Sequence, residues 1–128
     1  MQRAKEMYFK LCENYGKKML LHIDIYGDNI ISDNGDYRII DPKGIVGDPI
    51  FETGQFIFNE CCENKINPEN IEIMCNYLEN SINIPGNILR QCFYIETVRF
   101  ICYYVARYGA SEFDVERINF AYDKSLFT

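Results

Sequence analysis

Three side chains whose oxygen atoms suit metal binding and proton transfer lie close together in this sequence. Asp24 comes first, Asn29 follows it five positions later, and Asp41 stands beyond an Asn-Gly dipeptide at positions 34–35. Asn-Gly between two β-prone runs is the strongest short-range signal for a hairpin with a two-residue turn. Such a turn pairs residue 29 with residue 40, so Asn29 and Asp41 are expected side by side on strands about 4.8 Å apart. The sequence therefore predicts an oxygen-lined site at the base of one hairpin, with Asp24 on the loop that leads into it.

This arrangement is typical of phosphoryl transfer. Mg²⁺ takes one or two protein oxygen ligands and completes its octahedron with phosphate and water. The reaction needs such a metal and a carboxylate that orients and deprotonates the attacking hydroxyl. Kinase catalytic loops carry these groups as D-x-x-x-x-N, followed by a metal-binding Asp. We therefore assign Asp24 as the catalytic base and Asn29 and Asp41 as Mg²⁺ ligands. Each residue alone is better explained as a turn former, but the three together favour function.

Helices are expected to flank and hold the hairpin section. Residues 3–16 carry apolar side chains at helical spacing and end at Gly16, a natural helix stop. Asp48-Pro49 and Asn67-Pro68 each join an N-cap residue to a proline in the first turn, and they predict helices to about residues 60 and 81. The longest helix is expected to reach residue 108, and a last one starts at 111–114. The longest helix is predicted to carry an apolar stripe on one face, formed by Ile88, Cys92, Ile95, Val98, Cys102 and Val105.

The composition is that of one globular domain with an acidic surface. The chain has 128 residues, of which 48% are hydrophobic, and a net charge of −6. This charge argues against a nucleic-acid partner, which needs a basic stripe, and favours a cationic small molecule. We expect no membrane partner, because no run approaches the roughly 20 apolar residues of a membrane span. The six cysteines form no Cys-x-x-Cys pair, so we expect reduced core cysteines and a cytoplasmic protein.

Two stretches resemble a known family. Residues 20–31, LLHIDIYGDNII, resemble the catalytic loop of aminoglycoside phosphotransferases, usually written H-G-D-x-x-x-x-N. Residues 40–49, IDPKGIVGDP, resemble the streptomycin and hydroxyurea kinase branch, whose members carry a similar I-D-P-K-G stretch and then G-D-P or G-E-P. Phe51-Glu52 also fits that branch. The resemblance is specific over about residues 19–59. Beyond them, the sequence shows only a helical pattern that is compatible with the family.

The resemblance implies an α+β, mostly helical chain that forms the C-terminal lobe of a protein-kinase-like fold with a catalytic-loop β-hairpin. It implies transfer of the γ-phosphoryl group of ATP to a hydroxyl of an aminoglycoside such as streptomycin. Asp24 would be the base, and Asn29 and Asp41 would bind Mg²⁺. Residues 1–128 are expected to form this single lobe, with the N-terminal ATP-binding lobe absent and no nucleotide-binding residue assigned. We therefore expect weak or no turnover by this chain alone.

The loop departs from the family pattern at two positions. Ile23 stands where the motif has Gly, and Tyr26 stands where His is common. A β-branched residue is not expected to adopt backbone angles that only Gly tolerates, which predicts an altered loop. His22 is expected to brace the loop through hydrogen bonds rather than to transfer protons. Glu52 is attributed to the favourable position of an acid at a helix N-terminus.

Other interpretations remain open at this point. The chain could be a catalytically inactive kinase-like module that binds a small molecule or a protein. It could be a helical interaction domain whose hairpin is structural, or a kinase of another alcohol such as choline, a sugar or a homoserine-like metabolite. Candidate acids for a cationic substrate are Glu96, Glu112 and Asp114, although solvated helix faces explain them better. Tyr103 and Tyr104 are expected to be core or interface residues.

Overall fold

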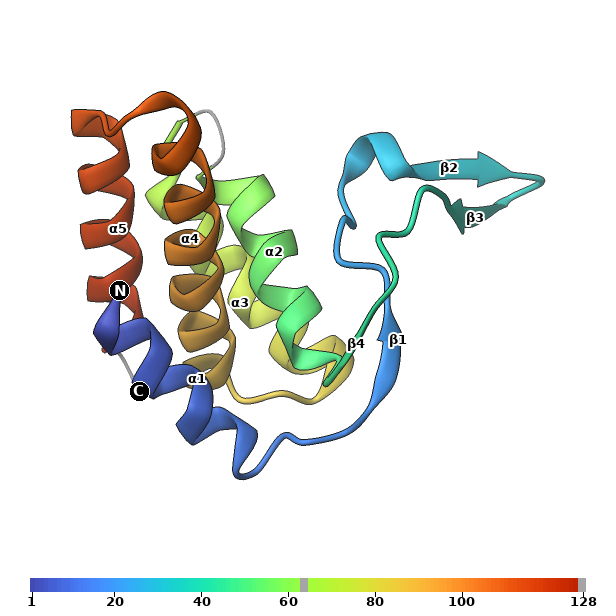
Figure 1. Cartoon of the computed structure of the whole chain (residues 1–128). Coiled ribbons are helices and arrows are strands. Elements are labelled where there is room, and N and C mark those ends of the chain that lie inside the picture. The colour runs from blue at the N-terminus through green and yellow to red at the C-terminus, as the bar shows by residue number, and fades with distance from the viewer. Residues whose placement is uncertain (63–64, 127–128) are drawn as a thin grey trace.

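The computed structural model describes residues 1–62 and 65–126 of the chain. The fold is α+β and mostly helical, with 63% of the residues in helices. A bundle of helices forms one part of the molecule, and an arm of short strands projects from it (Figure 1). The helices are α1 (Gln2–Cys12), α2 (Ile50–Cys61), α3 (Pro68–Ile82), α4 (Gly86–Tyr108) and α5 (Glu112–Ser125). The strands are β1 (Met19–Leu21), β2 (Ile30–Asp33), β3 (Asp36–Ile39) and β4 (Ile45–Gly47).

The predicted helices are confirmed, with one difference in length. α2, α3 and α4 begin and end within two residues of the expected positions, and α5 begins within the range expected for its start. α1 ends at Cys12 and not near Gly16, because the chain turns there: the N–H groups of Asn14 and Tyr15 both donate to the carbonyl of Leu11. The N–H of Lys17 then donates to the Asp48 carboxylate at 3.0 Å, which leads the chain across to the start of α2.

Helix α4 is the centre of the bundle. It contacts α1, α2, α3 and α5, so side chains around most of its circumference are removed from water. The predicted stripe is right at Cys92 and Val98 but incomplete, since other apolar positions of α4 are equally buried. These additional buried residues are Leu89, Phe93, Tyr94 and Ile101. Together with α2, α3 and α5 they form the main core, which includes Ile57, Phe58, Cys61, Cys62, Ile71, Cys75 and Ala121.

One glycine allows α2 and α4 to approach each other closely. A Cβ atom on Gly54 would lie 2.3 Å from the carbonyl oxygen of Cys92, a distance that no side chain can accept without backbone movement. This close crossing affects the loop between β1 and β2, because Glu52 and Gln55, which face that loop, lie on the same turn of α2 as Gly54. The backbone contact thus fixes the helix face that meets the loop.

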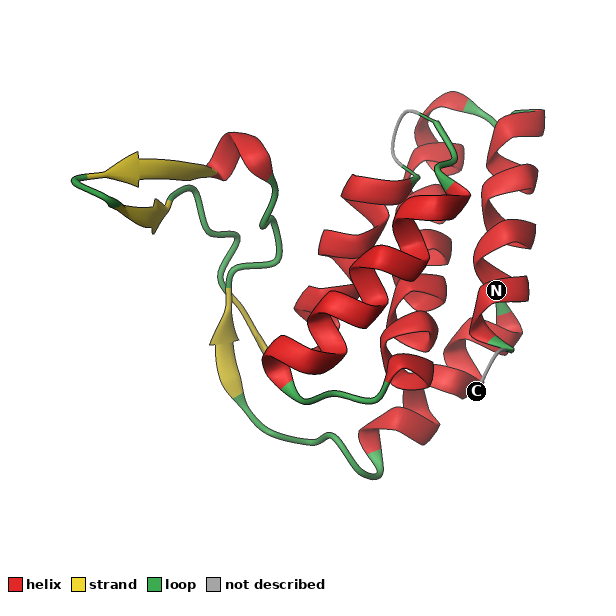
Figure 2. Cartoon of the chain, turned by 180° about the vertical axis from the view of Figure 1, so that it is seen from behind, coloured by secondary structure: helices red, strands yellow, loops and turns green. Residues whose placement is uncertain are grey.

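The arm contains two separate two-stranded sheets (Figure 2). β2 and β3 form the predicted hairpin, with Asn34 and Gly35 at its turn in positive φ, as a type I′ turn requires. The predicted register is confirmed, since the N–H of Ile40 donates to the carbonyl of Asn29 at 2.9 Å. β1 pairs antiparallel with β4, a pairing that the sequence analysis did not anticipate.

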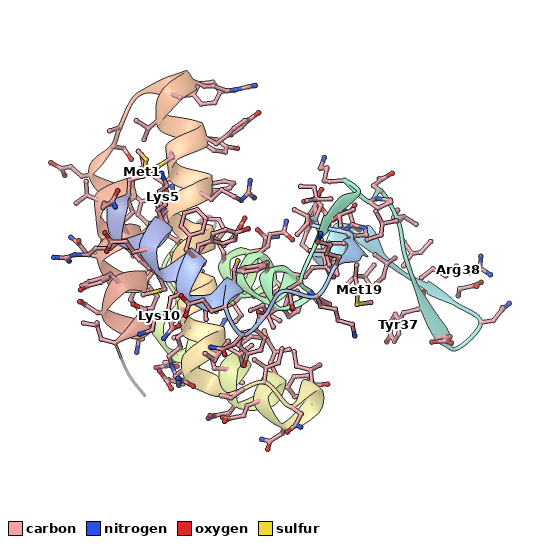
Figure 3. All side chains as sticks on the ribbon, turned by 60° about the horizontal axis from the view of Figure 1, so that its bottom comes forward. Met1, Lys5, Lys10, Met19, Tyr37 and Arg38 are labelled. Atoms are coloured by element: carbon pink, nitrogen blue, oxygen red, sulfur yellow. The ribbon has the colours of Figure 1, made fainter. Side chains whose placement is uncertain are left out.

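The far end of the β2–β3 hairpin extends away from the helices. Tyr37 and Arg38 lie there and point outward (Figure 3), and Arg38 forms an ion pair with its hairpin neighbour Asp33 at 2.5 Å. The base of the hairpin, by contrast, lies near α2. In the described ranges, none of the helices has the length and apolar character needed to cross a membrane.

Candidate functional site

Two side chains of α2 hold the loop that precedes the hairpin. Glu52 Oε1 accepts hydrogen bonds from the main-chain N–H groups of His22 and Ile23, the second at 2.9 Å. One turn later, Gln55 Oε1 accepts from the N–H of Ile25 at 3.0 Å. These bonds satisfy successive loop amides that have no strand partner, so α2 sets the path of the loop. The earlier attribution of Glu52 to the helix terminus is therefore incomplete.

His22 joins the loop to the strand that ends at Asp41. Its Nε2 lies 2.6 Å from the carbonyl of Ile40, and its Nδ1 accepts from the N–H of Asp24 at 3.1 Å. One neutral tautomer satisfies both contacts, with the proton on Nε2. The carbonyl of His22 also accepts from the N–H of Lys43 at 2.8 Å. The bracing role expected of His22 is confirmed by these bonds.

Ile23 adopts a backbone conformation that glycine enters more readily than other residues. Its φ is +58°, in the left-handed region that β-branched residues rarely enter. The expectation that Ile23 would not accept glycine-like angles is therefore wrong. Because Glu52 accepts from the N–H groups of the consecutive residues His22 and Ile23, the surroundings hold Ile23 in this conformation. A left-handed conformation costs an L-residue about 1–2 kcal/mol, so the loop stores strain here.

Asp24 is positioned by three polar neighbours. Its Oδ2 accepts from Asn29 Nδ2 at 3.3 Å, and its Oδ1 accepts from Gln55 Nε2 at 3.2 Å. Lys43 Nζ lies 3.7 Å from Oδ2, although its side chain is 63% exposed. The side chain of Asp24 is itself 27% exposed, so one part of the carboxylate remains open to a ligand. The carboxylate is thus oriented without being enclosed.

Asn29 stands opposite Ile40 at the base of the hairpin, and Asp41 is the next residue along the chain. Asn29 is buried, and its Nδ2 donates to the main-chain oxygen of Asp24 at 2.8 Å as well as to the carboxylate. Both N–H groups of the amide are then used, which leaves Oδ1 available as an acceptor. Asp41 is exposed, directly follows Ile40, and in the described part of the chain its carboxylate has no hydrogen-bond partner.

These two oxygen donors suit Mg²⁺ in their chemistry. Mg²⁺ is usually held by one or two protein oxygens plus substrate phosphates, and not by a cage made wholly of protein. No group of three or more His, Cys, Asp or Glu side chains able to hold a metal ion is found among residues 1–62 and 65–126. Asn29 Oδ1 and the Asp41 carboxylate would be the ligands.

A cavity of about 510 Å³ opens beside Asp24. Its walls come from the loop, from α2 and from the C-terminal half of α4, and we call it the Asp24 cavity. Residues that line it include Asp24, Lys43, Gln55, Glu96, Arg99 and Tyr104. Phe100 and Tyr104 stack on this wall with ring centroids 4.5 Å apart. The cavity is large enough for a drug-sized ligand.

The structure distinguishes the candidate substrate-binding acids from one another. Glu96 is buried and lines the Asp24 cavity, so the solvated-face interpretation is wrong for it. Asp114 is also buried, but it caps α5 through reciprocal bonds with Ser111 and pairs with Arg117 at 2.7 Å. Burial alone would raise the pKa of the Asp114 carboxyl, but the bonds from Ser111 and the charge of Arg117 outweigh it and lower that pKa. Glu112 is exposed, as expected of a solvated face.

Tyr103 and Tyr104 are not core residues. They are 52% and 43% exposed and both line the Asp24 cavity. The cysteine prediction, in contrast, is confirmed for the described residues: all six thiols are free, and Cys61, Cys62, Cys75 and Cys92 are buried.

Sequence reasoning missed the residues of α2 and α4 that complete the site. Gln55 and Arg99 carry no motif of their own, and their role depends on how the helices pack. A helix N-terminal Glu52 followed by Gln55 on the same face was the available signal for a helix that binds loop amides. No protein-family model, curated protein or solved structure matches this chain.

Proposed function

We propose that this chain is the C-terminal, acceptor-binding lobe of a small-molecule phosphotransferase of the aminoglycoside phosphotransferase family, of the streptomycin kinase type, in a protein-kinase-like fold. The observation that carries the proposal is the pair of hydrogen bonds from Asn29 to Asp24 at the base of a hairpin that ends at Asp41. One loop and one hairpin thereby gather a base and two metal ligands in the order of a kinase catalytic loop.

Asp24 acts on the acceptor hydroxyl. Its carboxylate faces the Asp24 cavity and is held by Gln55 and Asn29, so a hydroxyl bound there meets an oriented hydrogen-bond acceptor. The carboxylate would align the hydroxyl oxygen for attack on the γ-phosphorus and receive its proton as the new oxygen–phosphorus bond forms, while the bond from the γ-phosphorus to the β,γ-bridging oxygen breaks and ADP leaves. In this reaction class positioning contributes more than covalent chemistry by the protein.

Asn29 and Asp41 provide the metal ligands. Mg²⁺ bound there would neutralise the charge that develops on the phosphate oxygens. Asn29 has a second role, because the same side chain fixes Asp24 through Nδ2 while its Oδ1 would bind the metal. Lys43 lies 3.7 Å from Asp24 and is mostly exposed, which leaves it able to reach a phosphate at the mouth of the cavity. An ATP-binding lobe is the proposed partner that places the nucleotide against these residues.

Label transfer from γ-labelled ATP tests the proposal. The chain is incubated with MgATP and with streptomycin, choline, homoserine or a simple sugar, beside an Asp24→Asn variant. We expect slow labelling of streptomycin by the wild type and a loss of at least about 100-fold in Asp24→Asn, the usual contribution of a general base. Preferred labelling of another alcohol would keep the reaction and change the acceptor. Equal labelling by the two proteins, or no labelling together with no binding of a divalent metal at Asn29 and Asp41, would contradict the proposal and favour a structural hairpin.

A further inference from the structure

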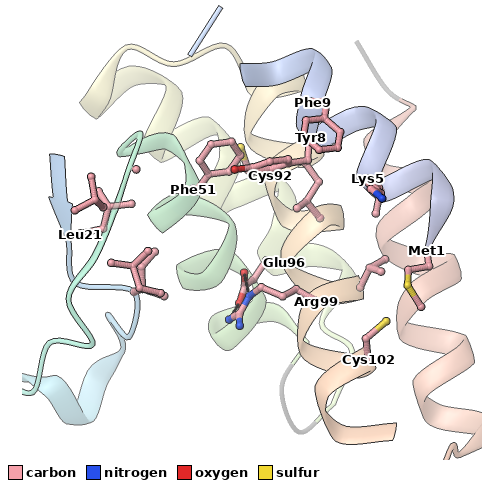
Figure 4. A pocket seen from close by; sticks show the side chains of 17 residues that line it. Met1, Lys5, Tyr8, Phe9, Leu21, Phe51, Cys92, Glu96, Arg99 and Cys102 are labelled. Atoms are coloured by element: carbon pink, nitrogen blue, oxygen red, sulfur yellow. Dashed lines mark hydrogen bonds and ion pairs between the residues drawn. The ribbon is translucent and has the colours of Figure 1, made fainter. Parts of the chain in front are cut away.

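Two cavities meet at one ion pair on α4. The Asp24 cavity is on one side of it, and a second cavity of about 520 Å³ lies between α1, β1, β4 and α4 (Figure 4). The two share four lining residues, Ile23, Ile45, Glu96 and Arg99. Figure 4 shows Glu96 and Arg99 side by side, projecting from α4 into the space between the helices and the arm.

The two members of this pair differ sharply in their exposure. Arg99 Nε lies 2.9 Å from Glu96 Oε2, and Arg99 NH2 lies 2.5 Å from Oε1, so the guanidinium binds both carboxylate oxygens. The side chain of Glu96 is only 10% exposed, whereas that of Arg99 is 57% exposed. A carboxylate removed from water to this degree needs a cation beside it. A largely exposed arginine can leave at small cost, because solvent replaces its interactions.

We infer that Glu96 is the site that binds a guanidinium group of the acceptor, and that Arg99 occupies this site while no ligand is bound. Only the identification of the ligand as the acceptor substrate rests on the proposed function. Binding of a guanidinium group to Glu96 itself requires no phosphoryl transfer. A ligand guanidinium presents the same planar pair of N–H donors that Arg99 now presents, whereas an ammonium group is a point charge without this geometry. Glu96 therefore favours guanidinium over amine.

The surroundings of Glu96 suit such a ligand. Tyr103, Tyr104 and Phe100 supply aromatic faces on the same wall of the Asp24 cavity, and a guanidinium stacks well on such faces. The chain already makes this contact nearby, where Arg107 lies 4.5 Å from the centroid of the Tyr103 ring. Since Asp24 and Glu96 line one cavity, a single molecule can bind Glu96 through its cation and offer a hydroxyl to Asp24.

Titration with two small cations tests the inference without ATP or metal. Methylguanidinium and methylammonium are added to the whole chain, and binding is followed by the shifts of backbone amide signals of α4 in NMR spectra. The variants are Glu96→Gln, which keeps the shape and removes the charge, and Arg99→Ala, which removes the internal competitor. Arg38→Ala is the matched control, because Arg38 forms an equally short ion pair with Asp33 on the hairpin, far from both cavities.

We expect wild-type protein to bind methylguanidinium weakly and to prefer it to methylammonium. Arg99→Ala should bind methylguanidinium roughly fivefold more tightly, the change that follows from removing an exposed ion pair that competes for the site. Glu96→Gln should lose the shifts, and Arg38→Ala should match the wild type. The inference would be overturned if Arg99→Ala binds methylguanidinium no more tightly than the wild type, and this result can be obtained even if Glu96→Gln fails to fold. Unchanged binding of methylguanidinium by a folded Glu96→Gln variant would also overturn it. If the variants show these methylguanidinium affinities but label transfer from ATP fails, the proposed phosphoryl transfer is contradicted and the guanidinium site is not.

Discussion

The side-chain nitrogen of Asn29 lies 2.8 Å from the main-chain oxygen of Asp24 and 3.3 Å from its carboxylate. One buried amide thus closes the loop between the two residues and orients the proposed base. Because Asn29 also opens the hairpin that is followed by Asp41, the same residue links the proposed base to the proposed metal ligand. The spacing of five residues between Asp24 and Asn29 is what allows this closure.

Loss of the Glu52 carboxylate should destabilise the loop. Glu52→Ala removes the acceptor for the N–H groups of His22 and Ile23, which then lack their shared partner. We expect a decrease of about 1–3 kcal/mol in the free energy of unfolding, measured by urea denaturation. Glu60→Ala on the exposed face of the same helix is the control and should change stability by less than about 0.5 kcal/mol. Equal effects of the two substitutions would show that Glu52 does not hold the loop.

Glycine should be better tolerated than alanine at position 23. Both Ile23→Gly and Ile23→Ala remove the apolar side chain, but only glycine enters the left-handed region freely. We expect Ile23→Gly to be more stable than Ile23→Ala by about 1 kcal/mol in thermal or urea unfolding, the reverse of the order in a regular helix. A more stable alanine variant would mean that the loop does not hold Ile23 at positive φ.

The sequence was sufficient for the local structure and for part of the site. Caps and prolines located α2 to α5 because these signals act within a few residues, and the Asn-Gly turn fixed the register of Asn29 against Ile40. The pairing of β1 with β4 and the bonds from Glu52 to the loop could not be predicted, since both depend on where distant segments pack. The burial of Glu96 could not be predicted for the same reason, because it requires the loop and α4 to face each other.

The crossing of α2 and α4 should depend on Gly54. A methyl group there meets the backbone of Cys92, so Gly54→Ala must push the two helices apart. We expect a loss of at least about 2 kcal/mol in the free energy of unfolding. Gly27→Ala is the matched control, because a Cβ at Gly27 has no atom within 4 Å and its backbone is not left-handed. If Gly54→Ala and Gly27→Ala unfold at the same denaturant concentration, the close crossing is not present in solution.

The buried thiols should be unreactive while the protein is folded. Burial raises the pKa of Cys61 and Cys92 to about 12 and that of Cys62 and Cys75 to about 11. The thiolate is the reactive species, so at pH 8 these four groups remain protonated and shielded. We expect a disulfide reagent to modify only the half-buried Cys12 and Cys102 in native protein, and all six thiols in denaturant. Rapid modification of more than two would contradict this packing of the core.

The most direct test of the central claim is to locate a divalent metal by NMR. Mn²⁺ replaces Mg²⁺ in the presence of ATP, and its paramagnetism broadens the signals of nearby residues. We predict selective broadening at Asp24, Asn29 and Asp41 that Asp41→Asn abolishes and Asp36→Asn, at an exposed acid of the same hairpin, retains. Asparagine tolerates the positive φ of residue 41, so the variant changes the ligand and not the backbone. Broadening that is equal in the two variants, or spread over the exposed acids, would contradict a metal site formed by Asn29 and Asp41.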